Sequence, residues 1–321
     1  MSSTAAVDAY LDHFTFALGS AKYGVEESAA AGRIINPAAA FLQSGFRFHH
    51  VCGEGETVLD LARAAVTPLG ERLSGVDAIV YATCIPANAN LGHPDRFAET
   101  NDVKHLMDFP ASRLQADLGL DDAFVVGIGQ QACTSMLGSV RVAHGLLATD
   151  SALRQVLCVS ADRFPPGATY EQAYSLISDG GAACVVSRDP AAYRLLAAHQ
   201  ITNGAMVSAD DDETVGSYFA YTHRLVTELL AKAGLTVTDI DWVVPQNTDG
   251  KAWRILSRLL GIDFDRVSCA SMPDVAHVIS GDNIINLAYL DQRGVVKPGQ
   301  RLLLTMAGYG MNWQGVVLEK A

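Results

Sequence analysis

The stretch that decides the fold is AFVVGIGQQACTSMLGSVRVAHGLL, residues 123–147, which carries a cysteine at position 133. The apolar run from Ala123 to Ile128 predicts a buried strand, and the small residues that follow Cys133 at helical spacing predict a buried helix. The thiol then lies at a strand-to-helix elbow, where unpaired backbone N–H groups and the positive end of the helix dipole favour thiolate. This placement suits a nucleophile for covalent acyl chemistry. The alternative is a small buried cysteine that only packs the helix against a sheet.

Composition restricts the class of protein. Of the 321 residues, 49% are hydrophobic and only 7% are aromatic, which favours an Ala/Val/Leu/Gly-rich α/β core over a β-sandwich. The formal net charge of −12 argues against nucleic-acid and anionic-membrane partners. The sequence has neither an apolar run of transmembrane length nor a basic start followed by an apolar stretch, so we expect a cytoplasmic protein without a signal peptide.

The cysteines indicate the same compartment. None of the six forms a CxxC pair, and two of them, Cys158 and Cys184, lie inside apolar strand-like runs. We therefore expect free thiols in a reducing cytoplasm, with neither disulfides nor a metal site.

The chain also repeats itself, because three segments of its first half resemble three segments of its second half in the same order. The pairs are LSGVDAIVYAT (73–83) with VTDIDWVVPQN (237–247), RQVLCVSAD (154–162) with GQRLLLTMAG (299–308), and GGAACVVS (180–187) with NWQGVVLE (312–319). This order predicts two duplicated α/β halves, residues 1–188 and 189–321, with mixed sheets around a pseudo-twofold axis. Chance similarity among Val/Ala-rich strands is the alternative for any single pair.

The repeat places Cys133 and His277, which are far apart in the sequence, at equivalent positions of the two halves. Cys133 and His277 precede the equivalent strands of the two halves by similar distances, so each is expected in the turn where a strand enters a buried helix. A pseudo-twofold axis would bring both turns to the centre of the molecule and make the thiol and the imidazole neighbours.

Five segments in order carry a resemblance to the thiolase superfamily, specifically to β-ketoacyl-carrier-protein synthase III-like proteins. They are SGFRFHHVCGEGETVLDLA (44–62), YATCIPAN (81–88), QQACTSMLGSV (130–140), ISDGGAACVV (177–186) and AGYGMNWQGVVLE (307–319). The resemblance implies a thiolase-like fold, in which the two sheets sandwich central helices. It also implies a homodimer formed through the strand region before Cys133, and no permanently bound cofactor.

Two departures from the family pattern bear on the reaction. Gln246 stands where condensing members carry a histidine, and glutamine can neither accept a proton nor carry positive charge. Where those members carry an asparagine, this chain has AHVISGDNIINL, with His277 and Asp282. The sequence thus resembles the acyltransferase branch of the family, whose members transfer acyl groups to oxygen or nitrogen. It differs from that branch in carrying AHxxxxD for GHxxxxD and in lacking the histidine of its HNVN motif.

Cys133, His277 and Asp282 would form a nucleophile, a base and an orienting carboxylate. The backbone N–H of Cys133 and another in the segment 308–310, which includes Tyr309 and Gly310, would hold the developing oxyanion.

Two side chains next to the triad, those of Asn247 and Gln246, complete the candidate site. Asn247 would add a side-chain donor, and Gln246 would help to position the reacting groups.

Each assignment has a structural alternative. His277 between apolar neighbours is also typical of a hydrogen-bonded buried histidine. Asp282 after Ser-Gly is also typical of a helix cap. Gln246 and Asn247 are also typical of residues that satisfy backbone groups at a strand end.

The sequence therefore favours an acyltransferase that moves an acyl group from a CoA or carrier-protein thioester, through Cys133, to a hydroxyl, amine or other group of a small-molecule or carrier-bound acceptor. The resemblance suggests a role in secondary metabolism. The alternatives are decarboxylating C–C condensation and a non-catalytic partner subunit. An acidic carrier protein would need a local basic patch on this acidic chain, and Arg47, Arg163, Arg254 and Arg258 are the candidates.

Overall fold

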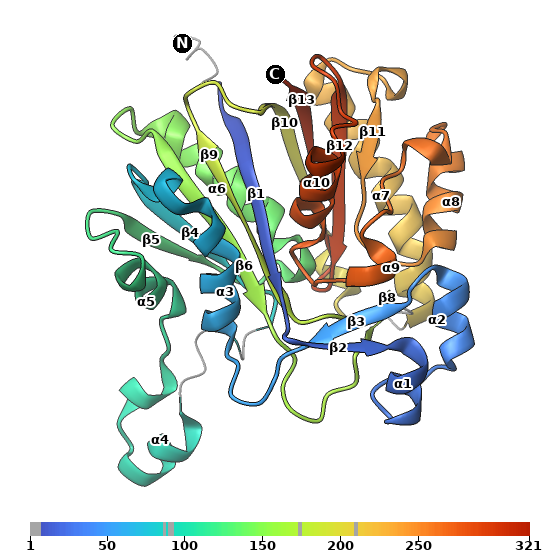
Figure 1. The fold of residues 1–321 in the computed structure, drawn as a ribbon. Helices are drawn as coiled ribbons and strands as arrows, with labels where there is room; N and C mark the ends of the chain where they lie inside the picture. Colours follow the sequence, from blue (N-terminus) through green and yellow to red (C-terminus); the bar gives the residue numbers. More distant parts are fainter. Residues whose placement is uncertain (1–7, 86–87, 89–92, 173–174, 209–210) are drawn as a thin grey trace.

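The computed structural model describes residues 8–85, 88, 93–172, 175–208 and 211–321, so residues 86–87 of the segment 81–88 lie outside the described part. A large mixed sheet runs through the molecule in the strand order β11-β12-β13-β10-β1-β9-β6-β4-β5 (Figure 1). Its strands are β1 (Tyr10–Leu18), β4 (Ala78–Ala82), β5 (Phe124–Ile128), β6 (Gln155–Asp162), β9 (Gly180–Ser187), β10 (Tyr193–Thr202), β11 (Trp242–Val244), β12 (Arg301–Gly308) and β13 (Asn312–Lys320).

Helices cover the sheet, and two short ribbons form separate two-stranded sheets. The helices are α1 (Val25–Ala30), α2 (Ala38–Ser44), α3 (Val58–Val66), α4 (Pro94–Thr100), α5 (Pro110–Asp117), α6 (Ser135–Thr149), α7 (Asp211–Ala233), α8 (Gly250–Leu260), α9 (Met272–Val275) and α10 (Asp282–Arg293). The ribbons pair β2 (Ala21–Gly24) with β3 (Phe48–Val51) and β7 (Glu171–Gln172) with β8 (Ser175–Leu176). No helix of the described residues combines the length and the hydropathy that crossing a bilayer requires.

The sheet consists of two equivalent halves. In the first half β9 pairs antiparallel with β1 and β6, and β6 pairs parallel with β4. In the second half β13 pairs in the same way with β10 and β12, and β12 pairs parallel with β11. The three sequence pairs fall on the equivalent strands β4 and β11, β6 and β12, and β9 and β13, so the predicted duplication is confirmed. The two halves meet where Tyr10 and Leu11 of β1 pair with Arg194 and Tyr193 of β10.

Layering follows from the two buried faces of each half-sheet. In β4, Ala78, Val80 and Ala82 face the central core, whereas Ile79 and Tyr81 face a separate outer core. Residues in a strand alternate between faces, so a continuous apolar run marks a strand covered on both sides. The predicted layering of sheet and helices is therefore correct, with the two half-sheets joined through β1 and β10 into one sheet.

The helices divide between the inner and the outer layers. Helices α6 and α10 pack centrally and contact strands of both halves, while α3 and α7 cover the outer faces. Strand β9 ends at Ser187 and β10 begins at Tyr193. The boundary at residue 188 between two domains stays a prediction.

Candidate active site

Cys133 occupies the turn that the sequence predicted. Strand β5 ends at Ile128, a 3₁₀ turn spans Ala132–Thr134, and α6 begins at Ser135. Gln130 and Ala132 have φ angles of 62° and 45°, a left-handed conformation that costs energy for residues with a side chain. This strained elbow places Cys133 at the start of the buried helix with 4% of its surface exposed.

His277 occupies the equivalent turn of the second half. Ala276, which precedes it as Ala132 precedes Cys133, also has a positive φ, at 57°. The His277 backbone N–H donates to Leu176 O at 2.9 Å, and its carbonyl accepts from the Ser178 N–H at 2.9 Å. A segment of the first half thus anchors a residue of the second. Cys133 and His277 line the same cavity, as the duplication predicts.

Asp282 orients the imidazole. Its Oδ2 lies 2.6 Å from His277 Nδ1 and 2.7 Å from the Asn247 backbone nitrogen, and its Oδ1 accepts from the Val278 N–H at 2.7 Å. Nδ1 therefore carries the proton, and Nε2 is the nitrogen available to the thiol. Helix α10 begins at Asp282 itself after the N-cap Gly281, and the carboxylate bonds outside the helix, so Asp282 is not its N-cap.

Electrostatics favour a charged pair. Burial alone disfavours a charged imidazolium, but the charge and hydrogen bond of Asp282 outweigh it and raise the pKa of His277 to about 10. The Cys84 side chain is the largest cause of the lowered pKa of Cys133. Together with the hydrogen bond and charge of His277, it lowers the pKa of Cys133 against the opposing effect of burial. The arrangement favours a Cys133 thiolate beside a His277 imidazolium.

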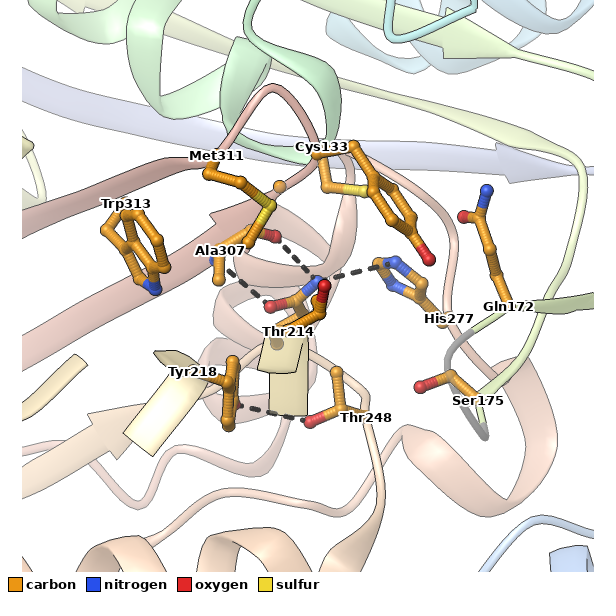
Figure 2. A pocket seen from close by; sticks show the side chains of 13 residues that line it. Cys133, Gln172, Ser175, Thr214, Tyr218, Thr248, His277, Ala307, Met311 and Trp313 are labelled. Atoms are coloured by element: carbon orange, nitrogen blue, oxygen red, sulfur yellow. Dashed lines mark hydrogen bonds between the residues drawn. The ribbon is translucent and has the colours of Figure 1, made fainter. Parts of the chain in front are cut away.

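Gln246 is fixed by the backbone of β12. Its Oε1 accepts from the Ala307 N–H at 3.0 Å, and its Nε2 donates to Ala307 O at 3.0 Å (dashed lines, Figure 2). Since Ala307 offers one donor and one acceptor, the amide has a single orientation, with Nε2 facing His277 Nε2 at 3.4 Å. Gln246 thus holds the end of β12 near the imidazole and presents no base there.

The Asn247 side chain does not reach the cavity, which corrects its prediction as an oxyanion donor. Its Nδ2 donates to Ser271 Oγ at 3.0 Å and to Ala276 O at 2.9 Å, and its Oδ1 accepts from Asn286 Nδ2 at 2.9 Å. The whole amide is used in a buried network. Through Ala276, Asn247 instead supports the turn that carries His277.

The segment 308–310 contacts the Cys133 turn through its first residue. A Cβ on Gly308 would lie 2.8 Å from the Cys133 backbone nitrogen, so only glycine allows this approach. Tyr309 lines the cavity with 40% of its surface exposed. Gly310 is in the β12–β13 turn at φ +83°. The structure therefore brings Gly308, rather than Gly310, against Cys133.

A cavity of about 90 Å³ opens on Cys133 and His277. Its remaining walls are Gln172, Ser175, Thr214, Tyr218, Gln246, Thr248, Ala307, Gly308, Tyr309, Met311 and Trp313, most of which are labelled in Figure 2. Both halves contribute, as the pseudo-twofold axis requires. Within the described residues no cluster of three or more His, Cys, Asp or Glu side chains could hold a metal ion.

Sequence reasoning missed Cys84, whose side chain is the first cause of the lowered pKa of Cys133. It follows β4, and its backbone N–H donates to both carboxylate oxygens of the buried Asp162 at 3.0 Å. Strands β4 and β5 are parallel neighbours with Ala82 opposite Ile128, so the residues that follow them meet at one edge. A cysteine directly after a predicted parallel strand was the available signal.

Comparisons with known proteins agree with this geometry. Residues 129–204 match the model of 3-oxoacyl-[acyl-carrier-protein (ACP)] synthase III, and residues 230–320 match the model of its C-terminal part, together more than half of the chain. The β-ketoacyl-[acyl-carrier-protein] synthase III of Rhizorhabdus wittichii is 27% identical over 304 residues, covering 86% of this chain and 88% of the relative. That of Roseobacter denitrificans is 26% identical over 305 residues, with the same coverage.

Solved structures share the fold over nearly the whole chain. The synthase III of Thermus thermophilus has a TM-score of 0.81 at 20% identity and covers 96% of this chain and 98% of its own. An acyltransferase named ChlB3 has a TM-score of 0.80 at 20% identity, with 98% of each chain covered. The chain belongs to the β-ketoacyl-[acyl-carrier-protein] synthase III-like family of the thiolase superfamily, a family of transferases.

Proposed function

We propose that this protein is a thioester-dependent acyltransferase in which Cys133 carries the acyl group. The observation that carries the proposal is the His277–Asp282 contact of 2.6 Å beside Cys133, combined with Gln246 at the condensing histidine's position. The site has a nucleophile, a base and an orienting carboxylate, which acyl transfer requires. By resemblance, the acceptor belongs to secondary metabolism.

The first half-reaction loads the enzyme. The Cys133 thiolate attacks the thioester carbonyl, and the oxyanion that forms is stabilised by backbone N–H groups of the Cys133 turn and the adjoining Gly308 segment. The tetrahedral intermediate collapses with cleavage of the carbon–sulfur bond to the donor. The His277 imidazolium gives its proton to the departing thiolate, which leaves acyl-Cys133 and a neutral imidazole.

The second half-reaction uses that neutral imidazole as a base. His277 Nε2 takes the proton of the acceptor hydroxyl or amine, whose oxygen or nitrogen attacks the acyl carbon. The Cys133 thiolate leaves and pairs again with the imidazolium, which Asp282 stabilises. No carbanion forms in this reaction, so acyl transfer needs no second histidine.

Decarboxylating condensation is the alternative within enzymes, and the names of the curated relatives favour it. Against it stands the amide of Gln246, which is bonded to Ala307 on both of its polar atoms and cannot carry positive charge near a developing enolate. A non-catalytic partner subunit is the third reading. The positive φ angles of Ala132 and Ala276 argue against it, since strain of this kind is otherwise unnecessary in a scaffold.

An anionic acyl donor, such as an acyl-carrier protein or CoA, suits the charge of the surface beside the cavity. Helix α8 begins directly after Thr248 of the cavity wall and Asp249, and its exposed face carries Lys251, Arg254 and Arg258. This basic face offers an acidic carrier a local attraction on an acidic protein. Of the other predicted cations, Arg47 is exposed and Arg163 is bonded to the Glu56 carbonyl.

A homodimer through β5 is part of the proposal. Strand β5 is one of the two edge strands of the sheet, and Phe124 at its start is 43% exposed. An unpaired edge with apolar side chains invites pairing with a second strand. Light scattering should give the mass of a dimer for the wild type and of a monomer for Phe124→Asp.

The experiment that tests the function is intact-protein mass spectrometry after incubation with a panel of acyl-CoAs and acyl-carrier proteins. We expect an acyl adduct on the wild type and none on a folded Cys133→Ala variant. An unchanged adduct on that variant would refute Cys133 as the nucleophile. Lys251→Glu should weaken loading from an acidic carrier protein.

A second assay separates acyl transfer from condensation. Acyl-enzyme is mixed with malonyl thioester in one arm and with hydroxyl and amine acceptors in the other. We expect no β-ketoacyl product in the malonyl arm. Formation of that product at a rate comparable to acyl transfer would favour the condensing alternative.

A further inference from the structure

The candidate active-site cavity has two unlike sides. Figure 2 shows Met311 and Trp313 along one side of the cavity, and His277 and Ser175 along the other. An apolar wall suits the carbon chain of an acyl group on Cys133. His277 takes the proton of the acceptor in the second half-reaction, so the acceptor belongs on the side that carries the imidazole.

Ser175 is the buried polar residue of that side. It is 3% exposed, and its Oγ makes no hydrogen bond to any other residue that the structure describes. Figure 2 shows this hydroxyl turned into the cavity. Buried hydroxyl groups in proteins are nearly always paired. The Ser175 hydroxyl is therefore placed to bind a molecule that enters the cavity.

The backbone fastens Ser175 to the turn that carries His277. Ser175 and Leu176 form β8, and the Leu176 carbonyl accepts from the His277 N–H at 2.9 Å. Ile177 pairs with His277 in a parallel bridge, and the Ser178 N–H donates to the His277 carbonyl at 2.9 Å. Three consecutive residues after Ser175 thus bind the backbone of His277, which holds the hydroxyl and the imidazole at one end of the cavity.

The hydroxyl and the imidazole together offer two hydrogen-bond acceptors. In the acyl-enzyme the neutral His277 presents Nε2, and Ser175 presents the lone pairs of Oγ. A primary amine has two N–H groups and a lone pair, so it can donate to both acceptors while its lone pair attacks the acyl carbon. An alcohol has a single O–H and can donate to only one of them. The pair therefore suits a primary amine better than an alcohol.

The charge of the protein agrees with an amine acceptor. A primary amine such as that of lysine is mostly an ammonium ion at neutral pH. A protein with a net charge of −12 attracts such a cation, and the described walls of the cavity carry no Lys or Arg to repel it. The ammonium ion gives one proton to water to become the reactive amine.

We propose that Ser175 binds the acceptor and that the acceptor is a primary amine, which makes the product an amide. This inference rests on the proposed function, because it concerns the second half-reaction. The amine nitrogen attacks the acyl carbon, the new C–N bond forms, and the C–S bond to Cys133 breaks. One N–H proton passes to His277 Nε2, and the other stays on the amide nitrogen beside Ser175. One acyl thioester and one amine thus give one amide and one thiol.

The test compares the wild-type acyl-enzyme with that of Ser175→Ala. Each is mixed with propylamine, N-methylpropylamine or 1-propanol, and the products are measured by mass spectrometry. We expect Ser175→Ala to slow amide formation from propylamine roughly 10-fold or more, because the amine becomes positively charged as it attacks and loses a hydrogen bond. N-methylpropylamine has one N–H and 1-propanol one O–H, so Ser175→Ala should leave their rates close to those of the wild type.

Ser187→Ala is the matched control. Ser187 is also buried, but its hydroxyl donates to the Asp189 carbonyl at 2.9 Å at the end of β9. All three acceptors should react with this variant at wild-type rates. If circular dichroism shows that Ser175→Ala does not fold, Ser175→Gly replaces it, since it removes the same hydroxyl.

The outcomes separate this inference from the proposed function. If the wild type forms an acyl adduct and Ser175→Ala changes the rates with all three acceptors equally, or changes none, the inference is overturned and the acyltransferase stands. Faster ester than amide formation by the wild type overturns it as well. If no adduct forms on wild-type Cys133, the proposed function fails and this inference fails with it.

Discussion

Asp282→Asn is the substitution that tests the triad most directly. Oδ2 of Asp282 accepts from His277 Nδ1 and from the Asn247 N–H, whereas Oδ1 accepts only from the Val278 N–H. The amide of the variant will therefore place its oxygen at the Oδ2 position and its NH₂ against Val278. His277 keeps its tautomer and its place, but the imidazolium loses the negative charge beside it.

The expected decrease in rate follows from removing the negative charge beside the imidazolium. A hydrogen bond to a charged group contributes about 1.5–3 kcal/mol, which corresponds to a rate roughly 10- to 150-fold lower. The Val278 N–H is left unpaired in the core, which costs stability about 1–3 kcal/mol more. His277→Ala removes the base itself and should slow transfer by at least about 100-fold. We expect Asp282→Asn to cost no more than that.

The assay is single-turnover acylation of Cys133 followed by mass spectrometry, with Cys133 alkylation measured against pH in parallel. Since Asp282 raises the pKa of His277, its removal lowers that pKa, weakens the ion pair and reduces thiolate at neutral pH. A merely structural role would lower stability without moving the alkylation profile. Asp274→Asn is the control, because Asp274 is exposed and pairs only weakly with Lys22 at 3.5 Å. An Asp282→Asn rate equal to that of the wild type would refute the reasoning.

Three further substitutions test separate parts of the site. His277→Ala should move the alkylation profile of Cys133 to higher pH, because the lowered pKa of that thiol depends partly on the imidazolium; an unmoved profile would contradict the ion pair. Gly308→Ala should slow acylation and lower the melting temperature, since its Cβ would lie 2.8 Å from the Cys133 backbone nitrogen and overpacking costs about 1–3 kcal/mol. Gly129→Ala, with no heavy atom within 4 Å of its Cβ, is the control for that melting curve, and equal effects would exclude the proposed contact. Gln246→Glu should destabilise the protein by about 1–3 kcal/mol in denaturant titrations, because a carboxylate cannot donate to the Ala307 carbonyl; an unchanged midpoint would argue against the fixed amide.

Much of the fold could be predicted because its signals are local or repeated. Apolar runs such as Ala78–Ala82 mark strands buried on both faces, and the three matched segment pairs reveal the duplication. The capping box of Thr57 and Asp60 likewise marks the start of α3. The duplication alone implied that Cys133 and His277 would be neighbours, because it placed both in equivalent turns.

The prediction for the Asn247 side chain was wrong for a physical reason. Asn247 and Gln246 are adjacent after β11, and the sequence treats their amides alike. In the structure Gln246 faces His277 and β12, while Asn247 turns to Ser271 and Asn286. Which side a polar residue faces at a strand end depends on the partners that other elements bring, and no local pattern encodes those partners.

The sequence by itself determined the duplicated α/β architecture and the family, and it pointed to Cys133 and His277 as the candidate nucleophile and base, because each leaves a pattern of spacing or a motif along the chain. Only the tertiary structure decided the contact of His277 Nδ1 with Asp282 and the approach of Gly308 to Cys133. The physical reason is the distance along the chain over which each interaction acts. Hydrophobic periodicity acts within one element, whereas hydrogen bonds and close backbone contacts act over a few ångströms between segments separated by tens of residues or more. Those contacts exist only after the two halves have packed around α6 and α10.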